Sequence, residues 1–236
     1  MKFKSIHGKG NFSRTHLVQK FSDEVLPRLN SENELSVAVV GGSQSDPEVT
    51  EIRQFIPNCQ VTTFGIEFAE IYLDLNRATD DLGLQKFDLV LCSQVFEHIW
   101  NHREASNTLL KLAKTNGLIW VSVPASNRPH GSPGYFTAGL TADFLNNLFT
   151  SCKGHTLALG MIGTKRNYAA THSLPYWLSV SGHRFPLLFG PTDRVWWKQL
   201  LYLVFFLPTN FRLSLLSATL SSDVSTATES WILIRA

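Results

Sequence analysis

The chain has 236 residues and a formal net charge of +2 at pH 7, with 44% hydrophobic and 17% charged residues. This is enough for one large domain or two small ones, and no internal repeat or low-complexity segment stands out. The first ten residues contain no apolar run, so we expect no secretory signal and a cytoplasmic protein. The three cysteines are odd in number and widely spaced, which favours reduced thiols over a disulfide or metal set.

Charge is distributed unevenly along the chain. Residues 1–20 hold five Lys/Arg and no acid, residues 21–150 hold eight against sixteen acids, and residues 151–236 hold eight against three. Either these charges are scattered and solvated, or the two basic flanks converge on an anionic partner. The acidic centre and the lack of an aromatic and basic stripe argue against a nucleic-acid partner.

The N-terminal part reads as a helical cover over residues 1–34, followed by a strand. Leu17, Phe21 and Val25 recur at four-residue spacing, which predicts an amphipathic helix over Phe12–Asn30. The run Leu35–Val40 is short, apolar and rich in β-branched residues, as expected of the first strand of a buried sheet.

A turn of small residues, Gly41-Gly42-Ser43-Gln44-Ser45, follows this first strand. Asp46 is a good N-cap and Pro47 a good first residue, so we expect a helix over Pro47–Ile56. A small-residue turn between a strand and a helix presents backbone N–H groups and the helix N-terminus to a ligand.

The second strand, Val61–Ile66, ends at Glu67 and is followed closely by the run Ile71–Leu73. Only four residues, 68–71, separate the strand from that run, whereas a parallel crossover needs a dozen residues or more. We therefore expect residues 71–74 to form an edge loop, or a strand in some other pairing, that still positions Asp74.

The stretch Phe87–Pro124 contains two apolar runs, Phe87–Cys92 and Leu118–Val123, separated by a helical pattern. On one face of that pattern lie Ala105, Leu109, Leu112 and Ala113. Asn116-Gly117 is expected to stop the helix, because Gly tolerates the left-handed conformation just past a C-terminus. Strand, helix and strand of this length predict a parallel βαβ unit, in which ligands bind outside the carboxyl ends of the strands, here at Ser93-Gln94.

The rest of the chain alternates loops with shorter elements. A loop over Ala125–Gly139 contains His130, and Thr141 is expected to cap a helix over Ala142–Phe149. Thr156–Ile162 and Ser230–Ile234 read as the last two strands. Residues 164–228 are then an aromatic-rich insertion between them.

The sequence from Phe87 to Pro124 resembles the fourth- to fifth-strand region of class I S-adenosylmethionine (SAM) dependent methyltransferases. Its most specific marks are Glu97-His98 and the Asn-Gly before Leu118, and the Glu-His type is similar to quinone-biosynthesis and bacterial glycan-cluster methyltransferases. The resemblance covers roughly residues 36–162 and the final strand. It implies one α/β domain over residues 1–236, with a doubly wound, mostly parallel, Rossmann-like sheet. The last strand would be antiparallel, between the fifth and the sixth, and the third-strand region irregular.

The same resemblance assigns the small-residue turn to the amino-acid end of SAM. The family carries acid-x-Gly-x-Gly-x-Gly there; Gly41, Ser43 and Ser45 fall on the glycine positions, with Gly42 between them, and Val39 replaces the acid. The ammonium of SAM would then need another partner, such as a backbone carbonyl near Gly41 or the side chain of Gln94. We accordingly expect weaker discrimination against analogues that lack the amino group than a family member with the acid would show.

Two acidic positions match the rest of the cofactor motif. Glu67 would bind the ribose hydroxyls, and Asp74-Leu75-Asn76 resembles the segment that meets the adenine amino group. Ser93 and Gln94 complete the expected SAM site. The alternative is that these acids are surface residues beside a turn.

Histidines are the candidate bases. His98 follows the fourth strand and His130 follows the fifth, so both are placed to face the methyl group if the acceptor must lose a proton. A hydrogen-bonded structural His98 and a surface His130 are the alternatives. His102 lies four residues after His98, a metal-binding spacing, but no third ligand is evident and we predict no metal.

Two other functions compete with methyl transfer. A non-catalytic scaffold of the same fold is suggested by the degenerate turn, and a nicotinamide-dependent dehydrogenase is disfavoured because no Gly-x-Gly-x-x-Gly follows the first strand. The aromatic and basic residues of the 164–228 insertion suggest an amphiphilic or phosphorylated acceptor, such as a lipid- or nucleotide-linked glycan, or a homodimer interface. The run Val195–Leu207 falls short of the ~20 residues that span a bilayer, which leaves peripheral membrane contact open.

Overall fold

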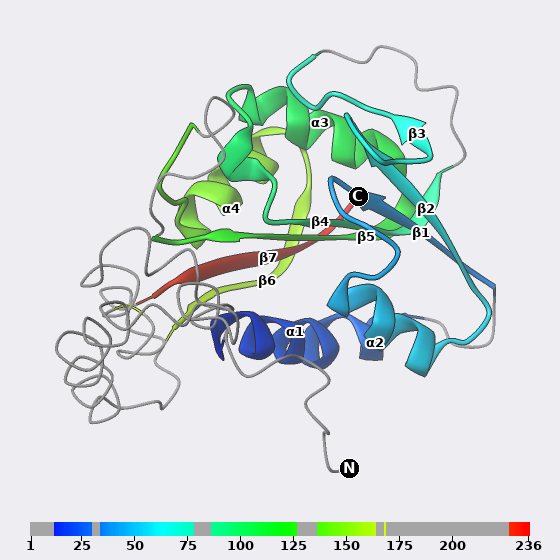
Figure 1. The fold of residues 1–236 in the computed structure, drawn as a ribbon. Helices are drawn as coiled ribbons and strands as arrows, with labels where there is room; N and C mark the ends of the chain where they lie inside the picture. Colours follow the sequence, from blue (N-terminus) through cyan, green and yellow to red (C-terminus); the bar gives the residue numbers. More distant parts are fainter. Residues whose placement is uncertain (1–11, 30–33, 78–85, 127–135, 164–167, 169–226) are drawn as a thin grey trace, which may run out of the picture.

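Seven strands form one sheet in the order β3-β2-β1-β4-β5-β7-β6 (Figure 1). The computed structural model describes residues 12–29, 34–77, 86–126, 136–163, 168 and 227–236. The strands are β1 (Leu35–Val40), β2 (Cys59–Gly65), β3 (Ile71–Tyr72), β4 (Phe87–Ser93), β5 (Ala113–Pro124), β6 (His155–Ile162) and β7 (Glu229–Arg235).

Four helices cover the two faces of this sheet. Their bounds are α1 (Phe12–Glu24), α2 (Pro47–Phe55), α3 (His102–Leu112) and α4 (Ala142–Ser151), with short 3-10 turns η1 (Leu26–Arg28) and η2 (Phe96–His98). Figure 1 shows α1 and α2 on one face and α3 and α4 on the other. No helix in these described ranges is long and apolar enough to cross a bilayer.

Each face of the sheet has its own apolar core. Phe64, Phe96 and Phe149 are fully buried on the α3/α4 face, while Phe21 and Trp120 pack edge to face on the α1/α2 face. Because both faces are covered, strands such as β1 and β4 are apolar on both faces rather than alternating, apart from Ser36 and Asp88 near their amino-terminal ends.

The predicted doubly wound, mostly parallel sheet is confirmed. β1 pairs in parallel with both β2 and β4, and β4 pairs in parallel with β5. β7 is antiparallel to both β5 and β6, between which it lies, as expected. The strand order reverses between β1 and β4, so their carboxyl ends flank the crevice where such folds bind ligands.

The prediction that residues 71–74 form an edge loop, or a strand in a pairing other than parallel, was wrong: β3 pairs in parallel with β2 at the edge of the sheet. Phe64 is in register with Ile71 and Gly65 with Tyr72 after a loop of only a few residues. Since only two residues pair, the chain needs a tight reversal rather than a helical crossover. Phe68 makes that reversal with a left-handed φ of 55°.

The end of α3 also differs from the prediction. The helix stops at Leu112, and Ala113 already pairs with Phe87 of β4. Asn116, not Gly117, takes the left-handed conformation, with a φ of 65°. Gly117 is required for space instead, because a Cβ there would lie 3.0 Å from the carbonyl oxygen of Phe87.

The ends of three helices show two smaller differences from the prediction and one agreement. α1 ends at Glu24 rather than Asn30, before the η1 turn that contains Pro27. Asp46 occupies the N-cap position of α2, but its backbone oxygen rather than its side chain accepts from the helix. The cap at α4 is as predicted, since Thr141 Oγ1 accepts from the N–H of Phe144.

Candidate functional site

The turn after β1 is built against the chain that follows β4. Gly41 has a φ of 72°, and a Cβ on it would lie 2.6 Å from Cγ2 of Val95. Only glycine therefore permits this approach. The backbone of the turn is held to the neighbouring strand, because the N–H of Gly41 donates to the carbonyl of Phe64 at 2.7 Å.

The serines of this turn bond mainly to one another and to the first residues of the helix. Ser43 Oγ lies 2.9 Å from Ser45 Oγ and donates to Asp46 Oδ1 at 2.9 Å. Ser43 and Ser45 are exposed, and Asp46 is half-buried. The hydroxyls of Ser43 and Ser45 thus bond within the turn itself.

The residues predicted to hold ribose and adenine follow β2 and β3 at the same edge. Glu67 is exposed, and its side chain makes no hydrogen bond or ion pair with the described part of the chain. Asp74 accepts from the N–H of Asn76 and pairs with Arg77 at 3.2 Å. Leu75 is buried in the α3/α4 core. Of the four predicted residues, Glu67 thus has the most available carboxylate.

Asn76 connects the loop after β3 to the segment before α3. Its Oδ1 accepts from the N–H of Trp100 at 2.9 Å and from that of Asn101 at 3.4 Å. Asn101 in turn caps α3. The side chain of Asn76 is therefore used to hold two loops together.

Ser93 and Gln94 form a tight turn at the end of β4. Gln94 has a φ of 60°, and its N–H donates to the carbonyl of Ser122 at 2.7 Å. Ser93 Oγ donates to Glu48 Oε1, and Gln94 Nε2 donates to Glu229 Oε2, both at 3.0 Å. This turn thus contacts carboxylates from α2 and from β7.

The Glu-His pair lies in η2, directly after that turn. His98 Nε2 is 3.9 Å from Glu97 Oε1; the Glu97 side chain is 2% exposed and that of His98 33%. Burial, with the charge of Glu97 adding to it, raises the pKa of the Cys92 thiol, so Cys92 is an inert core residue. The N–H of Phe136 donates to the carbonyl of Glu97 at 2.9 Å, which brings the loop after β5 beside this pair.

The other two histidines of the prediction differ in outcome. His130 lies outside the described residues. His102 stacks on Phe96 and its Nε2 is 3.0 Å from the Phe96 carbonyl oxygen, a structural role. No group of three His, Cys, Asp or Glu residues able to hold a metal occurs within the described ranges.

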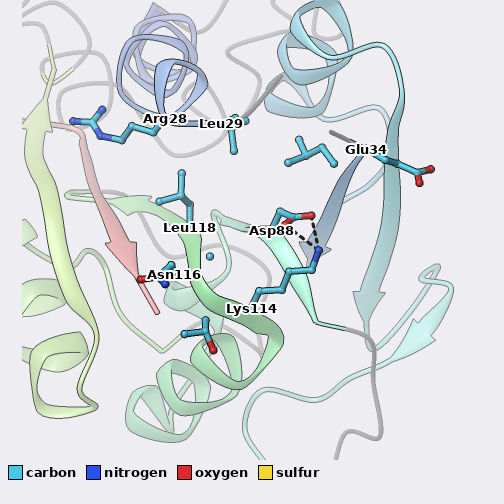
Figure 2. A pocket seen from close by; sticks show the side chains of 10 residues that line it. Arg28, Leu29, Glu34, Asp88, Lys114, Asn116 and Leu118 are labelled. Atoms are coloured by element: carbon cyan, nitrogen blue, oxygen red, sulfur yellow. Dashed lines mark hydrogen bonds and ion pairs between the residues drawn. The ribbon is translucent and has the colours of Figure 1, made fainter. Parts of the chain in front are cut away.

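A cavity of about 200 Å³ lies at the opposite, amino-terminal edge of the sheet (Figure 2). Its charged lining residues are already paired: Lys114 Nζ donates to both carboxylate oxygens of Asp88 at 2.9 Å, Arg28 pairs with Glu24, and Glu34 accepts from Gln60. Because ligands of doubly wound sheets bind at the carboxyl ends, we give this cavity no part in the site.

The residues at the carboxyl edge fit SAM by their own chemistry. The Gly41 turn leads into the N-terminus of α2, and Glu67 offers an accessible carboxylate at the end of the adjacent strand. Ser122 Oγ is buried and has no hydrogen-bond partner within the described part of the chain. An amino-acid nucleoside needs hydrogen-bonding groups of these kinds. Val39, 2% exposed, supplies no polar group.

Two buried carboxylates were missed by sequence reasoning. Glu48 precedes Ile52 by four residues, which places it on the inward face of α2. Glu229 alternates with Trp231 and Leu233, which face the α1/α2 core. In both cases the acidic residue falls at the spacing of the buried apolar residues of its helix or strand, and this spacing could have predicted its burial.

By sequence, the chain matches no family profile and no curated protein. Its fold is shared by solved structures. Coclaurine N-methyltransferase bound to N-methylheliamine and SAH superposes with a TM-score of 0.58 at 12% identity, covering 99% of this chain and 76% of that one. A sarcosine dimethylglycine methyltransferase, so assigned in Galdieria sulphuraria, gives 0.58 at 9% identity over 94% and 85%.

A third solved structure with this fold is that of a cyclase rather than a methyltransferase. The [4+2]-cyclase SpnF has a TM-score of 0.51 at 12% identity, covering 93% of this chain and 79% of that one. At such identities the likeness establishes the fold, while the reaction depends on the residues of the site.

Proposed function

We propose that the chain is a SAM-dependent methyltransferase. The observation that carries the proposal is the convergence of the Gly41 turn, the N-terminus of α2 and the Ser93-Gln94 turn at the switch point of the sheet. When bound, SAM supplies a sulfonium methyl group, whose in-line transfer requires alignment more than a strong acid.

In this proposal each residue of the site contacts a different part of SAM or of the acceptor. The turn that would hold the amino-acid end of SAM consists of Gly41, Gly42, Ser43 and Ser45. Glu67 accepts hydrogen bonds from the ribose hydroxyls, and Asp74 lies toward the adenine. His98 is the general base where the acceptor must lose a proton, with the buried Glu97 beside it.

A calorimetric titration of the full chain with SAM and with S-adenosylhomocysteine (SAH) tests the proposal. We expect saturable one-site binding of both and, with a competent acceptor, transfer of a radiolabelled methyl group. Absence of binding to the folded protein would refute it.

The competing function is a non-catalytic scaffold. It is favoured by Val39 in place of an acid and by the Ser43, Ser45 and Asp46 side chains that bond within the turn. A scaffold of this kind would leave both ligands unbound in the same titration.

For the acceptor we propose an amphiphilic or phosphorylated molecule, such as a lipid- or nucleotide-linked glycan. Beside the Glu-His pair, Trp100 is 62% exposed and Phe136 52%, which offers aromatic surface to an apolar portion. The basic residues proposed for a phosphate, Arg166 and Arg184, lie outside the described residues.

Replacing Arg166 and Arg184 by Ala should raise the acceptor KM and leave SAM affinity nearly unchanged. The alternative use of the 164–228 segment is a homodimer interface. In that case, sedimentation of the same double variant would show a monomer, and a kinetic assay would give the wild-type acceptor KM.

A further inference from the structure

The Ser93-Gln94 turn bonds to two buried carboxyl groups, one from α2 and one from β7. Glu48 is 1% exposed and accepts from Ser93 Oγ at 3.0 Å, while Glu229 is 8% exposed and accepts from Gln94 Nε2 at 3.0 Å. Ser93 and Glu48 lie on the α1/α2 side of the sheet. Glu48 is in the first turn of α2, which follows the Gly41 turn. Glu48 thus places a carboxyl group near the end of β1, where Val39 provides none.

The strand register places Glu48 close to Val39 on the same face. Val39 is paired with Leu91 and packs in the α1/α2 core, and Ser93 is the next residue of β4 on that face. The carboxylate that Ser93 binds is therefore one step nearer the carboxyl edge than the Val39 side chain. Glu48 reaches this place from the first turn of α2, whose N-terminus favours negative charge.

A second, independent feature points to a ligand at this place. Ser122 is in register with Ser93 and its side chain faces the same side of the sheet, since Trp120 two residues earlier lies in the α1/α2 core. Ser122 is 0% exposed, and its Oγ has no hydrogen-bond partner among the described residues. Trp120 Nε1 and Trp231 Nε1 on this face are also buried without a partner among the described residues, but Ser122 is the one of the three that is in register with Ser93, whose hydroxyl binds Glu48. A ligand at this edge would supply the hydrogen-bond partner that a buried hydroxyl normally has.

We propose that Glu48 is the carboxylate that binds the α-ammonium of the cofactor's methionine moiety, with Ser122 Oγ as a further acceptor. This inference rests on the proposed function. An ammonium has three N–H donors and no acceptor, which suits one carboxylate and nearby hydroxyl oxygens. The side-chain nitrogen of Gln94 donates to Glu229, so Gln94 is the weaker candidate for this role. Contrary to the expectation from Val39 alone, the protein should discriminate strongly against ligands without the amino group.

Calorimetric titrations of the full chain with SAH and with 5′-methylthioadenosine, which lacks the amino-acid portion, test this proposal. In Glu48→Gln the Kd for SAH should rise at least tenfold, while that for methylthioadenosine stays within twofold of wild type. Glu51→Gln is the matched control, because Glu51 lies on the same helix and accepts from Ser22 of α1 instead. It should leave both Kd values unchanged.

A second arm needs no variant and so does not depend on folding. Wild-type protein should bind a deaminated SAH analogue at least tenfold more weakly than SAH. Equal binding of the two, or a Glu48→Gln protein with wild-type affinity for SAH, overturns the proposal, as does a loss seen in Glu229→Gln but not in Glu48→Gln. A wild-type protein that binds neither SAH nor methylthioadenosine would instead refute the proposed function itself.

Discussion

At the scale of single residues, Glu67 is the carboxylate most accessible to a ligand at the carboxyl edge. Hydrogen bonds to a charged group contribute roughly 1.5–3 kcal/mol, so Glu67→Ala should weaken SAM binding about tenfold or more. The measurement is a calorimetric titration. Glu34→Ala, which removes the same charge before β1 at the opposite edge, should bind SAM normally. Unchanged affinity in a folded Glu67→Ala protein would remove Glu67 from the site.

His98 carries the second prediction at this scale. A positioned general base contributes about 10²–10⁴-fold to the rate, so His98→Gln should lower kcat by that factor for any acceptor that loses its proton during transfer. SAM affinity should not change, because binding and proton removal involve different groups. His155→Gln, at the exposed start of β6, is the control. A His98→Gln enzyme with wild-type kcat would assign this side chain a structural role.

At the scale of elements, one carboxylate joins three strands at the amino-terminal edge. Asp88 of β4 accepts from the N–H and Oγ of Ser36 in β1 at 2.9 and 2.6 Å, and from Lys114 of β5 (Figure 2). Burial raises the pKa of Asp88, but the bonds from Ser36 and Lys114 outweigh it, and the net shift is downward.

Asp88→Asn should therefore lower the free energy of unfolding at pH 7 by about 1–3 kcal/mol, as measured by urea denaturation. The unfolded chain binds the proton first, so this contribution is fully present above an unfolded pKa of about 3.9 and is lost as the pH falls below it. Asp143→Asn, an exposed position on α4, should be neutral. A difference between wild type and Asp88→Asn that persists undiminished well below pH 3 would contradict the assignment.

Elements with long apolar runs could be predicted from the sequence, and short ones could not. β1, β4 and β7 are buried on both faces, so hydrophobicity alone marks them. β3 pairs through only two residues, and no periodicity exists over that length. The end of α3 depended on whether Asn116 or Gly117 takes the left-handed conformation. Either residue of this pair can adopt that conformation, and in the folded sheet it is Asn116, while Gly117 lies close to the backbone of Lys114 and Phe87.

The same distinction holds for the site. The turn after β1 and the position of Glu67 follow from local order along the chain, so sequence spacing locates them. The link from Gln94 to Glu229 joins residues 135 positions apart, and that from Ser93 to Glu48 joins residues 45 apart. These contacts exist only because β7 lies beside β5 in the sheet and because α2 covers the face on which Ser93 lies.

At the scale of the whole molecule, a ligand that binds only the folded state should raise its stability. SAM at one hundred times its Kd contributes about 2.7 kcal/mol, which for a domain of this size corresponds to a rise in Tm of roughly 5–11 °C. Differential scanning fluorimetry with SAM, and with ATP as a control adenine nucleotide, measures this directly. A Tm that does not respond to SAM at any concentration would favour the scaffold function.

The hairpin of β6 and β7 has a consequence for how the molecule can change over time. Ile162 is in register with Glu229, and the N–H of Thr228 donates to the Ile162 carbonyl at 3.0 Å, so the two ends of the intervening stretch are fastened together at the carboxyl edge. Residues 163–227 therefore leave and rejoin the sheet at one point, and an insertion or deletion between these ends does not change the separation that the ends must span. The register that positions Glu229 beside Gln94 is set by the strand ends themselves.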